Sequence, residues 1–289
     1  MARANECASC ASDGVRQAVH DARVVRNDRA TDALFVMELE VDAPDVPAAA
    51  APALAAAIRP GQFVHMSIPT LPSHILRRPF SVYAANAATG RIEVLYQKVG
   101  QGTAEMARWK PGQACDMIGP IGRGWQVPEG ATHALLVGGG VGAAPLFMLC
   151  EELVGRGVET DVVLGASTKD ALVCRERYAL ACGCAPSCST DDGTFGREGF
   201  CTPLVGEAVA ASVAAGNPYD YAAVCGPEPL MRAASATMAD AGIACEVSME
   251  KRMACGVGAC LSCVVDTVEG RRRACVDGPV FDARKVVWR

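Results

Sequence analysis

The chain has 289 residues, of which 51% are hydrophobic, and this is enough to fill the cores of two or three domains. Its net charge is −5 at pH 7, and only 5% of its residues are aromatic. These values exclude a basic nucleic-acid surface and a row of stacking rings for single strands, so a small molecule or another protein is the expected partner.

The sequence also predicts where the protein works. The opening segment MARANECASC has no apolar core of the kind that a secretion signal needs. No uninterrupted apolar run approaches the roughly 18 residues of a membrane span. The 15 cysteines fit a reducing compartment and would be a liability in an oxidising one. We therefore expect a cytoplasmic protein with no membrane partner.

The first domain is predicted to be a small antiparallel β-barrel at residues 14–128, after an N-terminal tail at residues 1–13. Alternation of apolar and polar residues predicts strands at 33–41, 62–68 and 91–99. An Ala- and Pro-rich insertion around residues 48–57 separates the first two of these strands. Its prolines predict a surface excursion rather than one helix.

The predicted barrel contains a candidate flavin site. Arg78, Phe80 and Ser81 place a cation, an aromatic ring and a hydroxyl along one extended segment. A flavin dinucleotide can use such a set, with the guanidinium on its diphosphate and the hydroxyl on a polar ring atom. Gly102 and Thr103 follow the third strand in a turn able to bind phosphate through its amides. The alternative, which the residues alone leave open, is a buried strand with a snorkelling arginine.

The second domain, at residues 129–245, is predicted to be a parallel sheet with helices on its faces. Apolar strands alternate with helical segments, which is typical of nucleotide-binding folds. The expected strands lie at 133–140, 160–167, 219–226 and 244–250, and the expected helices at 143–157, 203–212 and 228–242.

A glycine-rich loop follows the first of these strands at Gly138, Gly139, Gly140 and Gly142. Glycines between a strand and a helix let a diphosphate approach backbone N–H groups, although they can also serve packing alone. The usual G-x-G-x-x-G spacing is absent, so a different nucleotide loop is predicted. Ser167, Thr168 and Lys169, near the expected ribose, give neither an acidic NAD signature nor an arginine cluster for NADP.

The third domain, at residues 246–289, contains a cysteine motif. Cys255, Cys260 and Cys263 lie on one loop and Cys275 follows, which is the plant-type ferredoxin order of [2Fe-2S] ligands. Glycines within the loop allow it to turn sharply and to point N–H groups at the sulfurs. A structural zinc and unliganded thiols are the alternatives, but zinc ribbons usually pair two short knuckles and only one occurs here.

Together these motifs resemble a known family. Arg-Pro-Phe-Ser at 78–81, the glycine loop at 138–145 and Cys-Gly-Pro-Glu-Pro at 225–229 resemble the ferredoxin reductase superfamily of flavin enzymes. The segment MEKRMACGVGACLSC, with RRRACVDGPVF after it, is similar to the electron-transfer subunits of two-subunit, NAD-dependent dihydroorotate dehydrogenases. The resemblance covers nearly the whole chain.

The resemblance implies a role for individual residues. It places [2Fe-2S] ligation on Cys255, Cys260, Cys263 and Cys275, and it places the NAD diphosphate at Gly138, Gly139, Gly140 and Gly142. It brings the nicotinamide near Cys225 and Gly226. It assigns FAD contacts to Arg78, Pro79, Phe80, Ser81, Leu95, Tyr96, Gln97, Gly102 and Thr103. It assigns no catalytic acid or base.

The function implied is an electron relay in de novo pyrimidine (UMP) biosynthesis. A separate catalytic subunit with FMN would oxidise dihydroorotate, and this chain would pass the electrons through the cluster and FAD to NAD+, in a heterotetramer. One alternative is a related FAD and [2Fe-2S] NAD(P)H oxidoreductase subunit that serves ferredoxin or a hydrogenase. Another is a zinc-stapled interaction module without enzymatic activity.

Some residues fall outside the family pattern. The sequence does not assign roles to Cys7, Cys10, Cys182, Cys184 and Cys188, which we expect to be unliganded thiols. Asp191 and Asp192 lie on a loop that is similar to the family's, and their role stays open.

Overall fold

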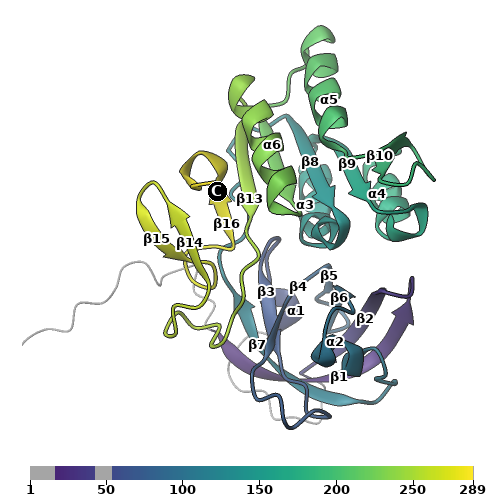
Figure 1. Cartoon of the computed structure of the whole chain (residues 1–289), viewed down its shortest axis with the longest axis vertical. Helices are drawn as coiled ribbons and strands as arrows, with labels where there is room; N and C mark the ends of the chain where they lie inside the picture. Colours follow the sequence, from purple (N-terminus) through teal and green to yellow (C-terminus); the bar gives the residue numbers. More distant parts are fainter. Residues whose placement is uncertain (1–16, 43–53, 289) are drawn as a thin grey trace, which may run out of the picture.

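The computed structural model describes residues 17–42 and 54–288, and it contains two seven-stranded sheets and a small hairpin unit. Figure 1 shows the antiparallel sheet below, the parallel sheet with its helices above, and the C-terminal hairpin at one side. This arrangement confirms the predicted fold class. The proposed domain limits at residues 128 and 245 stay a prediction.

The first sheet is curved into a barrel with the strand order β4-β3-β7-β1-β2-β6-β5, and all of its pairings are antiparallel. Its edges approach each other where Phe80 meets Tyr96, with 5.9 Å between the ring centroids. Alternating residues fill the barrel, among them the fully buried Met37 and Leu39. The strands are β1 (Ala18–Arg29), β2 (Leu34–Val41), β3 (Phe63–Met66), β4 (Arg78–Ser81), β5 (Ala84–Asn86), β6 (Arg91–Gln97) and β7 (Ala114–Ile121).

The end of the Ala- and Pro-rich insertion does not lie at the surface as predicted. Helix α1 (Leu54–Ala57) packs into the barrel core, and Leu54 is fully buried there. The expectation was wrong for this part because Leu54 and Ile58 add apolar surface that the barrel can bury. Residues 43–53 lie outside the described residues. A second short helix, α2 (Gln101–Met106), follows β6.

The second sheet has the order β11-β10-β9-β8-β12-β13-β16, and it is parallel except for β16. Every residue of β8 is buried, because helices cover both faces of the sheet. The strands are β8 (His133–Gly139), β9 (Glu159–Ala166), β10 (Ser187–Thr190), β11 (Arg197–Glu198), β12 (Tyr221–Cys225), β13 (Ala244–Ser248) and β16 (Val280–Asp282).

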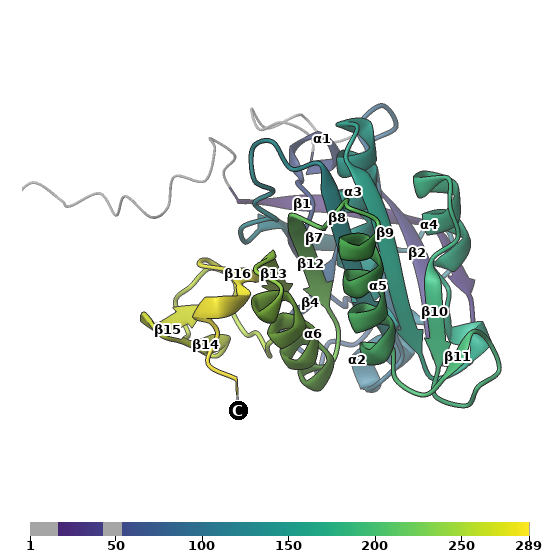
Figure 2. The same cartoon turned by 90° about the horizontal axis from the view of Figure 1, so that it is seen from above.

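Alternate residues of β8 contact different helices. Leu135 and Val137 pack in one apolar cluster with α5 (Thr202–Ala214) and α6 (Glu228–Asp240). Ala134 and Leu136 pack in another with α3 (Ala144–Gly155) and α4 (Arg175–Cys182). Figure 2 shows these helices beside the sheet. None of the helices in the two described stretches has the length and apolar character required to cross a membrane.

The C-terminal unit shares its core with the second sheet. Strands β14 (Val264–Thr267) and β15 (Gly270–Arg273) form a hairpin, and the chain then returns as β16 to pair with β13. Cys263 and Cys275 belong to the same apolar cluster as the strands of the sheet. The cysteine loop is therefore anchored on both sides.

Candidate functional site

The four predicted cluster ligands form two pairs. Cys263 and Cys275 are buried, with their sulfurs 3.3 Å apart. Cys255 and Cys260 form the more exposed pair, and the Cys255 sulfur accepts N–H groups from Val257 at 3.5 Å and from Cys260 at 3.4 Å. Backbone amides thus already point at a sulfur, which is what stabilises a metal-bound thiolate.

Glycine is required at two positions of the cysteine loop. Gly256 and Gly258 have φ values of +71° and +83°, in the left-handed region. A Cβ atom at Gly256 would lie 2.8 Å from His65 Nδ1, and one at Gly258 would lie 2.7 Å from Val276 Cγ2. A side chain at either position would push the loop off the surface that holds it.

The two pairs fit a two-iron cluster. A zinc ribbon needs all four sulfurs around one ion, whereas a [2Fe-2S] cluster needs two thiolates on each iron. Cys255 and Cys260 can supply two thiolates to one iron, and Cys263 and Cys275 can supply two to the other.

One thiol of each pair has a shifted pKa. Hydrogen bonds from the Ser262 hydroxyl and amide lower the pKa of Cys260 to about 6, and its sulfur lies 3.1 Å from Ser262 Oγ. Burial raises the pKa of Cys275 to about 12. Because the thiolate is the metal ligand, Cys260 is the more readily ionised of these two thiols.

The first residue of the predicted flavin strand β4 is Arg78, which lies near the start of α2. Arg78 lies beside Gly102 at the start of α2, where a Cβ atom would come 3.4 Å from Arg78 Nε. In the same turn, Thr103 Oγ1 accepts the N–H groups of Val99 and Gly100 at 2.9 and 3.2 Å. The Arg78 guanidinium therefore lies beside the first turn of α2, as binding of a diphosphate requires, whereas the amides of Val99 and Gly100 are already paired with Thr103.

The aromatic residues of the predicted flavin site point elsewhere. Phe80 and Tyr96 are buried in the barrel core, and the Tyr96 hydroxyl donates to Asn27 at 3.0 Å. The ring of Phe80 packs against that of Tyr96, and its contact with a flavin stays a prediction. Pro79 and Ser81 alternate with Arg78 and Phe80 along the strand and are half-buried.

The glycine loop packs against the end of β12. Gly142 approaches so closely that a Cβ atom there would lie 2.6 Å from the carbonyl oxygen of Cys225, and one at Gly139 would lie 2.6 Å from Leu230. Gly140 has a φ of +57°, and its missing side chain leaves open space. The structure thus brings together the two segments predicted to bind NAD, and Gly140 is the glycine that faces outward.

Cys225 itself is a core residue. Its side chain is buried, burial raises the pKa of its thiol, and its sulfur lies 3.7 Å from the carbonyl oxygen of Ser248. The thiol therefore has no thiolate character, and Cys225 contributes to the site through its main chain. Gly226 follows the end of β12 in a bend, with a φ of +157°.

A hollow of about 500 Å³ opens between the two sheets. It lies between the turn that joins β1 to β2, the glycine loop and the loop after β9. It unites residues from both predicted nucleotide sites and adds two carboxylates that the sequence did not single out, Asp32 and Asp170. The lining includes Thr31, Gln97, Gly140, Val141, Ser167 and Thr168. Leu95 lines a narrow crevice that also reaches Gly140.

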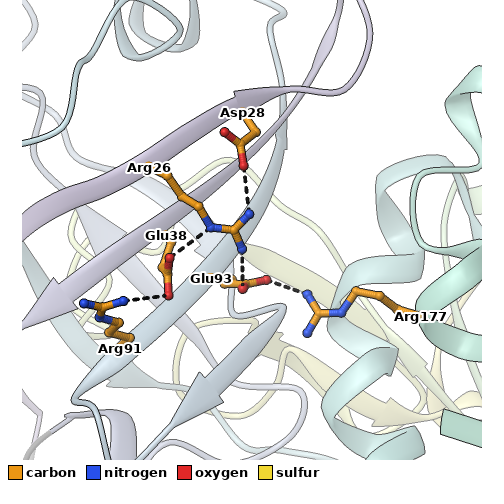
Figure 3. A network of polar contacts seen from close by, with 6 residues as sticks. All are labelled: Arg26, Asp28, Glu38, Arg91, Glu93 and Arg177. Carbon is orange, nitrogen blue, oxygen red and sulfur yellow. Dashed lines mark hydrogen bonds and ion pairs between the residues drawn. The ribbon is translucent and has the colours of Figure 1, made fainter. Parts of the chain in front are cut away.

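An ionic network fixes the two sheets relative to each other (Figure 3). Glu93 on β6 accepts from Arg26 at 2.8 Å and from Arg177 of α4 at 2.5 Å. The Arg177 guanidinium also lies 4.4 Å from the ring centroid of Tyr83 and 4.5 Å from that of Phe147. Glu93 precedes the predicted flavin contacts in β6, so this network positions one nucleotide site against the other.

The remaining cysteines are scattered. Cys182 at the end of α4 lies 3.2 Å from Cys150 of α3, measured between sulfurs. Cys184 is exposed and Cys188 is buried. Cys7 and Cys10 lie outside the described residues. Asp192 forms a local turn, accepting from the amide and hydroxyl of Thr194 at 3.0 and 2.7 Å.

Comparison with known proteins gives close relatives. Residues 250–287 match the family model for the iron-sulfur cluster binding domain of dihydroorotate dehydrogenase B. The electron transfer subunit of dihydroorotate dehydrogenase B (NAD(+)) from Desulforamulus reducens is 36% identical over 86% of this chain and 92% of its own length. The same subunit from Bacillus caldolyticus is 37% identical over 79% of this chain and 87% of its own length.

Solved structures agree with this fold. The NADH-dependent reduced ferredoxin-NADP oxidoreductase, studied for flavin-based electron bifurcation, superposes with a TM-score of 0.77 at 27% identity, over 92% of this chain and 89% of its own. The ferredoxin reductase of carbazole 1,9a-dioxygenase has a TM-score of 0.64 at 20% identity, over 80% and 68% of the two chains, and its likeness concerns the fold alone.

Proposed function

Because the chain belongs to the family of electron-transfer subunits of NAD-dependent dihydroorotate dehydrogenase B, we propose that it passes electrons from a catalytic partner subunit to NAD+. The family predicted from the sequence is thereby confirmed. The observation that carries the proposal is the position of the cysteine loop, which packs on β3 next to the predicted flavin strand β4. A [2Fe-2S] cluster supplies one-electron steps and FAD converts them to the hydride transfer that a nicotinamide needs.

The chain's own residues hold and orient these groups. In the proposal, the two cysteine pairs bind the cluster, and Arg78 with the turn at Gly102 and Thr103 binds the FAD diphosphate. Main-chain atoms of β4 and β6 border the flavin. The hollow beside Gly140 accepts NAD, and the close approach of Gly142 to Cys225 holds the glycine loop against β12.

The partner in this proposal carries FMN and oxidises dihydroorotate to orotate, in de novo pyrimidine (UMP) biosynthesis in the cytoplasm. We propose a heterotetramer with two copies of each chain, and three units in this chain at residues 14–128, 129–245 and 246–289. Service to ferredoxin or a hydrogenase is not favoured, because the relatives at 36% and 37% identity are dihydroorotate dehydrogenase subunits. Family membership also argues against a zinc-stapled module.

Activity of the separate and combined subunits tests the proposed function. Alone, the chain should oxidise NADH with artificial electron acceptors but should not oxidise dihydroorotate, because the proposal places FMN on the catalytic subunit. With the catalytic subunit it should co-purify and reduce NAD+ when dihydroorotate is added. Turnover of dihydroorotate by the chain alone, or a purified complex that reduces ferredoxin and not NAD+, would contradict the proposal.

Asp170 should determine the preference for NAD over NADP. It lines the hollow together with Ser167 and Thr168, where a negative carboxylate would repel a 2′-phosphate but accept a ribose hydroxyl. We expect Asp170→Ser to lower the ratio of kcat/KM for NADH to that for NADPH by about tenfold. The control is Asp240→Ser, which removes the same charge at the exposed end of α6. Equal ratios in both variants would rule out this role.

A further inference from the structure

His65 is a buried polar side chain whose hydrogen-bonding groups are unsatisfied. It lies in β3 with an exposed fraction of 0%, and among the described residues neither ring nitrogen has a partner in good hydrogen-bond geometry, although the backbone of Arg77 lies near the ring. The buried His20 and His133, in contrast, each contact polar groups through both ring nitrogens. Leaving a buried donor unpaired is costly, so such a group indicates a missing ligand.

The ring of His65 lies between the two predicted redox sites. On one side, His65 pairs in register with Pro79 of the flavin strand β4. On the other side, its Nδ1 contacts the cysteine loop at Gly256, where even a Cβ atom would come within 2.8 Å. Gly256 directly follows Cys255, a proposed cluster ligand. His65 therefore contacts the residue that follows a proposed cluster ligand, and it pairs with a residue of the flavin strand.

The surroundings of His65 restrict which ligand can satisfy it. The side chain of Pro79 has no polar atom, and Ile121 Cδ1 lies on the same side of the ring as Gly256. Arg77 is engaged with the backbone of Asp116 at 3.1 Å and with its carboxylate. The backbone of Arg77 is a polar group near the ring. On the Gly256 side of the ring, the acceptors that a bound cluster would add are its sulfur atoms beside Cys255. A charged imidazole carries an N–H group on Nδ1, and a neutral one carries it there in its Nδ1–H tautomer, which is the tautomer that this contact requires.

We propose that His65 is a positioning residue that donates a hydrogen bond from Nδ1 to the sulfur atoms of the cluster on its Cys255 side. This inference rests on the cluster assigned under the proposed function. The bond holds the cluster loop against β3, and so sets its distance from the flavin strand. A donor at the sulfurs also stabilises the extra negative charge of the reduced cluster, and therefore raises its reduction potential.

Substitution of His65 tests which nitrogen acts. His65→Leu removes both nitrogens and should shift the equilibrium of the cluster toward the oxidised form by about tenfold. This corresponds to a reduction potential that is about 59 mV lower for a one-electron couple. His65→Asn keeps an N–H group close to the position of Nδ1 and should restore most of the potential. His65→Gln places its amide near the position of Nε2 and should restore less. The measurement is a redox titration of the complete protein, followed by electron paramagnetic resonance.

A spectroscopic signature separates this role from a purely structural one. The sequence contains only four histidines, so labelling histidine with ¹⁵N gives a simple spectrum. Pulsed paramagnetic resonance of the reduced cluster should detect weak coupling to one histidine nitrogen in the native chain. The coupling should disappear in His65→Leu. The matched control is His133→Gln, at another buried histidine outside this site, which should keep both the coupling and the potential.

The outcomes can be distinguished. A native chain that binds no iron would overturn the proposed function itself. A native chain with a cluster, whose potential and nitrogen coupling are the same in His65→Leu, would overturn only the role of His65. A shift of the flavin potential without a shift of the cluster potential would also overturn it, because the ring would then serve the flavin. If His65→Leu does not fold, the comparison of His65→Asn with His65→Gln decides.

Discussion

Cys260→Ala should abolish the cluster and leave FAD in place. Cys260 belongs to the exposed cysteine pair, and hydrogen bonds from Ser262 give it the thiolate character that iron binding uses. Three thiolates cannot complete a Cys₄ ligand set. The predicted flavin contacts lie in the barrel, on a different part of the chain. Iron and acid-labile sulfide per chain should fall to background, while flavin absorbance stays at the native level.

Two further variants serve as controls for this result. Cys184→Ala removes an exposed thiol from the second sheet and should keep full iron content. Arg78→Ala should do the reverse of Cys260→Ala, since losing a charged hydrogen bond to the diphosphate weakens FAD binding by about 10- to 100-fold. Loss of both cofactors in either Cys260→Ala or Arg78→Ala would show that the two sites are not separate. Unchanged flavin occupancy in Arg78→Ala would remove Arg78 from the site.

The sequence predicted those features that are defined by residues close to one another along the chain. Cysteine spacing indicated the loop that brings Cys255 close to Cys260, and glycines indicated the two tight turns within it. The unbroken apolar run of β8 indicated a strand covered on both faces, because such a run has no polar side to expose. In each case the residues that define the feature lie within about ten positions of one another.

Features that depend on distant residues could not be predicted. Helix α4 was missed because its sequence, RERYALAC, buries only Tyr178 and shows little apolar periodicity. Phe80 and Tyr96 lie on different strands, so the packing of their rings in the barrel core could not be read from either strand alone. Glu93 and Arg177 are 84 positions apart, so no local pattern signals their ion pair.

His65 shows the same limit most clearly. In sequence it is one of the alternating residues of a strand, and nothing near it suggests a cofactor. Only the pairing with Pro79 and the approach of Gly256 from the far end of the chain reveal its position. The glycine at 256 was a signal that something must come close, but the sequence could not say what.

Leu261→Asp should uncouple the chain from its catalytic partner. Leu261 lies between two proposed cluster ligands, its side chain is 63% exposed, and its φ of +58° is in the left-handed region, where a bulky residue is strained. An exposed leucine in such a conformation has no benefit for the isolated chain, so contact with a partner is its expected role. Aspartate adopts this conformation more readily than leucine, and the loop should therefore keep its fold.

We expect the dihydroorotate:NAD+ activity of the complex with Leu261→Asp to fall by at least about tenfold, because a buried, unpaired carboxylate opposes docking. Titration of one subunit with the other should show weaker association. NADH oxidation by the free chain with an artificial acceptor should not change, since that reaction does not need the partner. Val268→Asp is the matched control, because it adds the same charge at a 70% exposed position in the turn after β14. If both variants keep native coupled activity, the partner must dock on another face of the cluster unit.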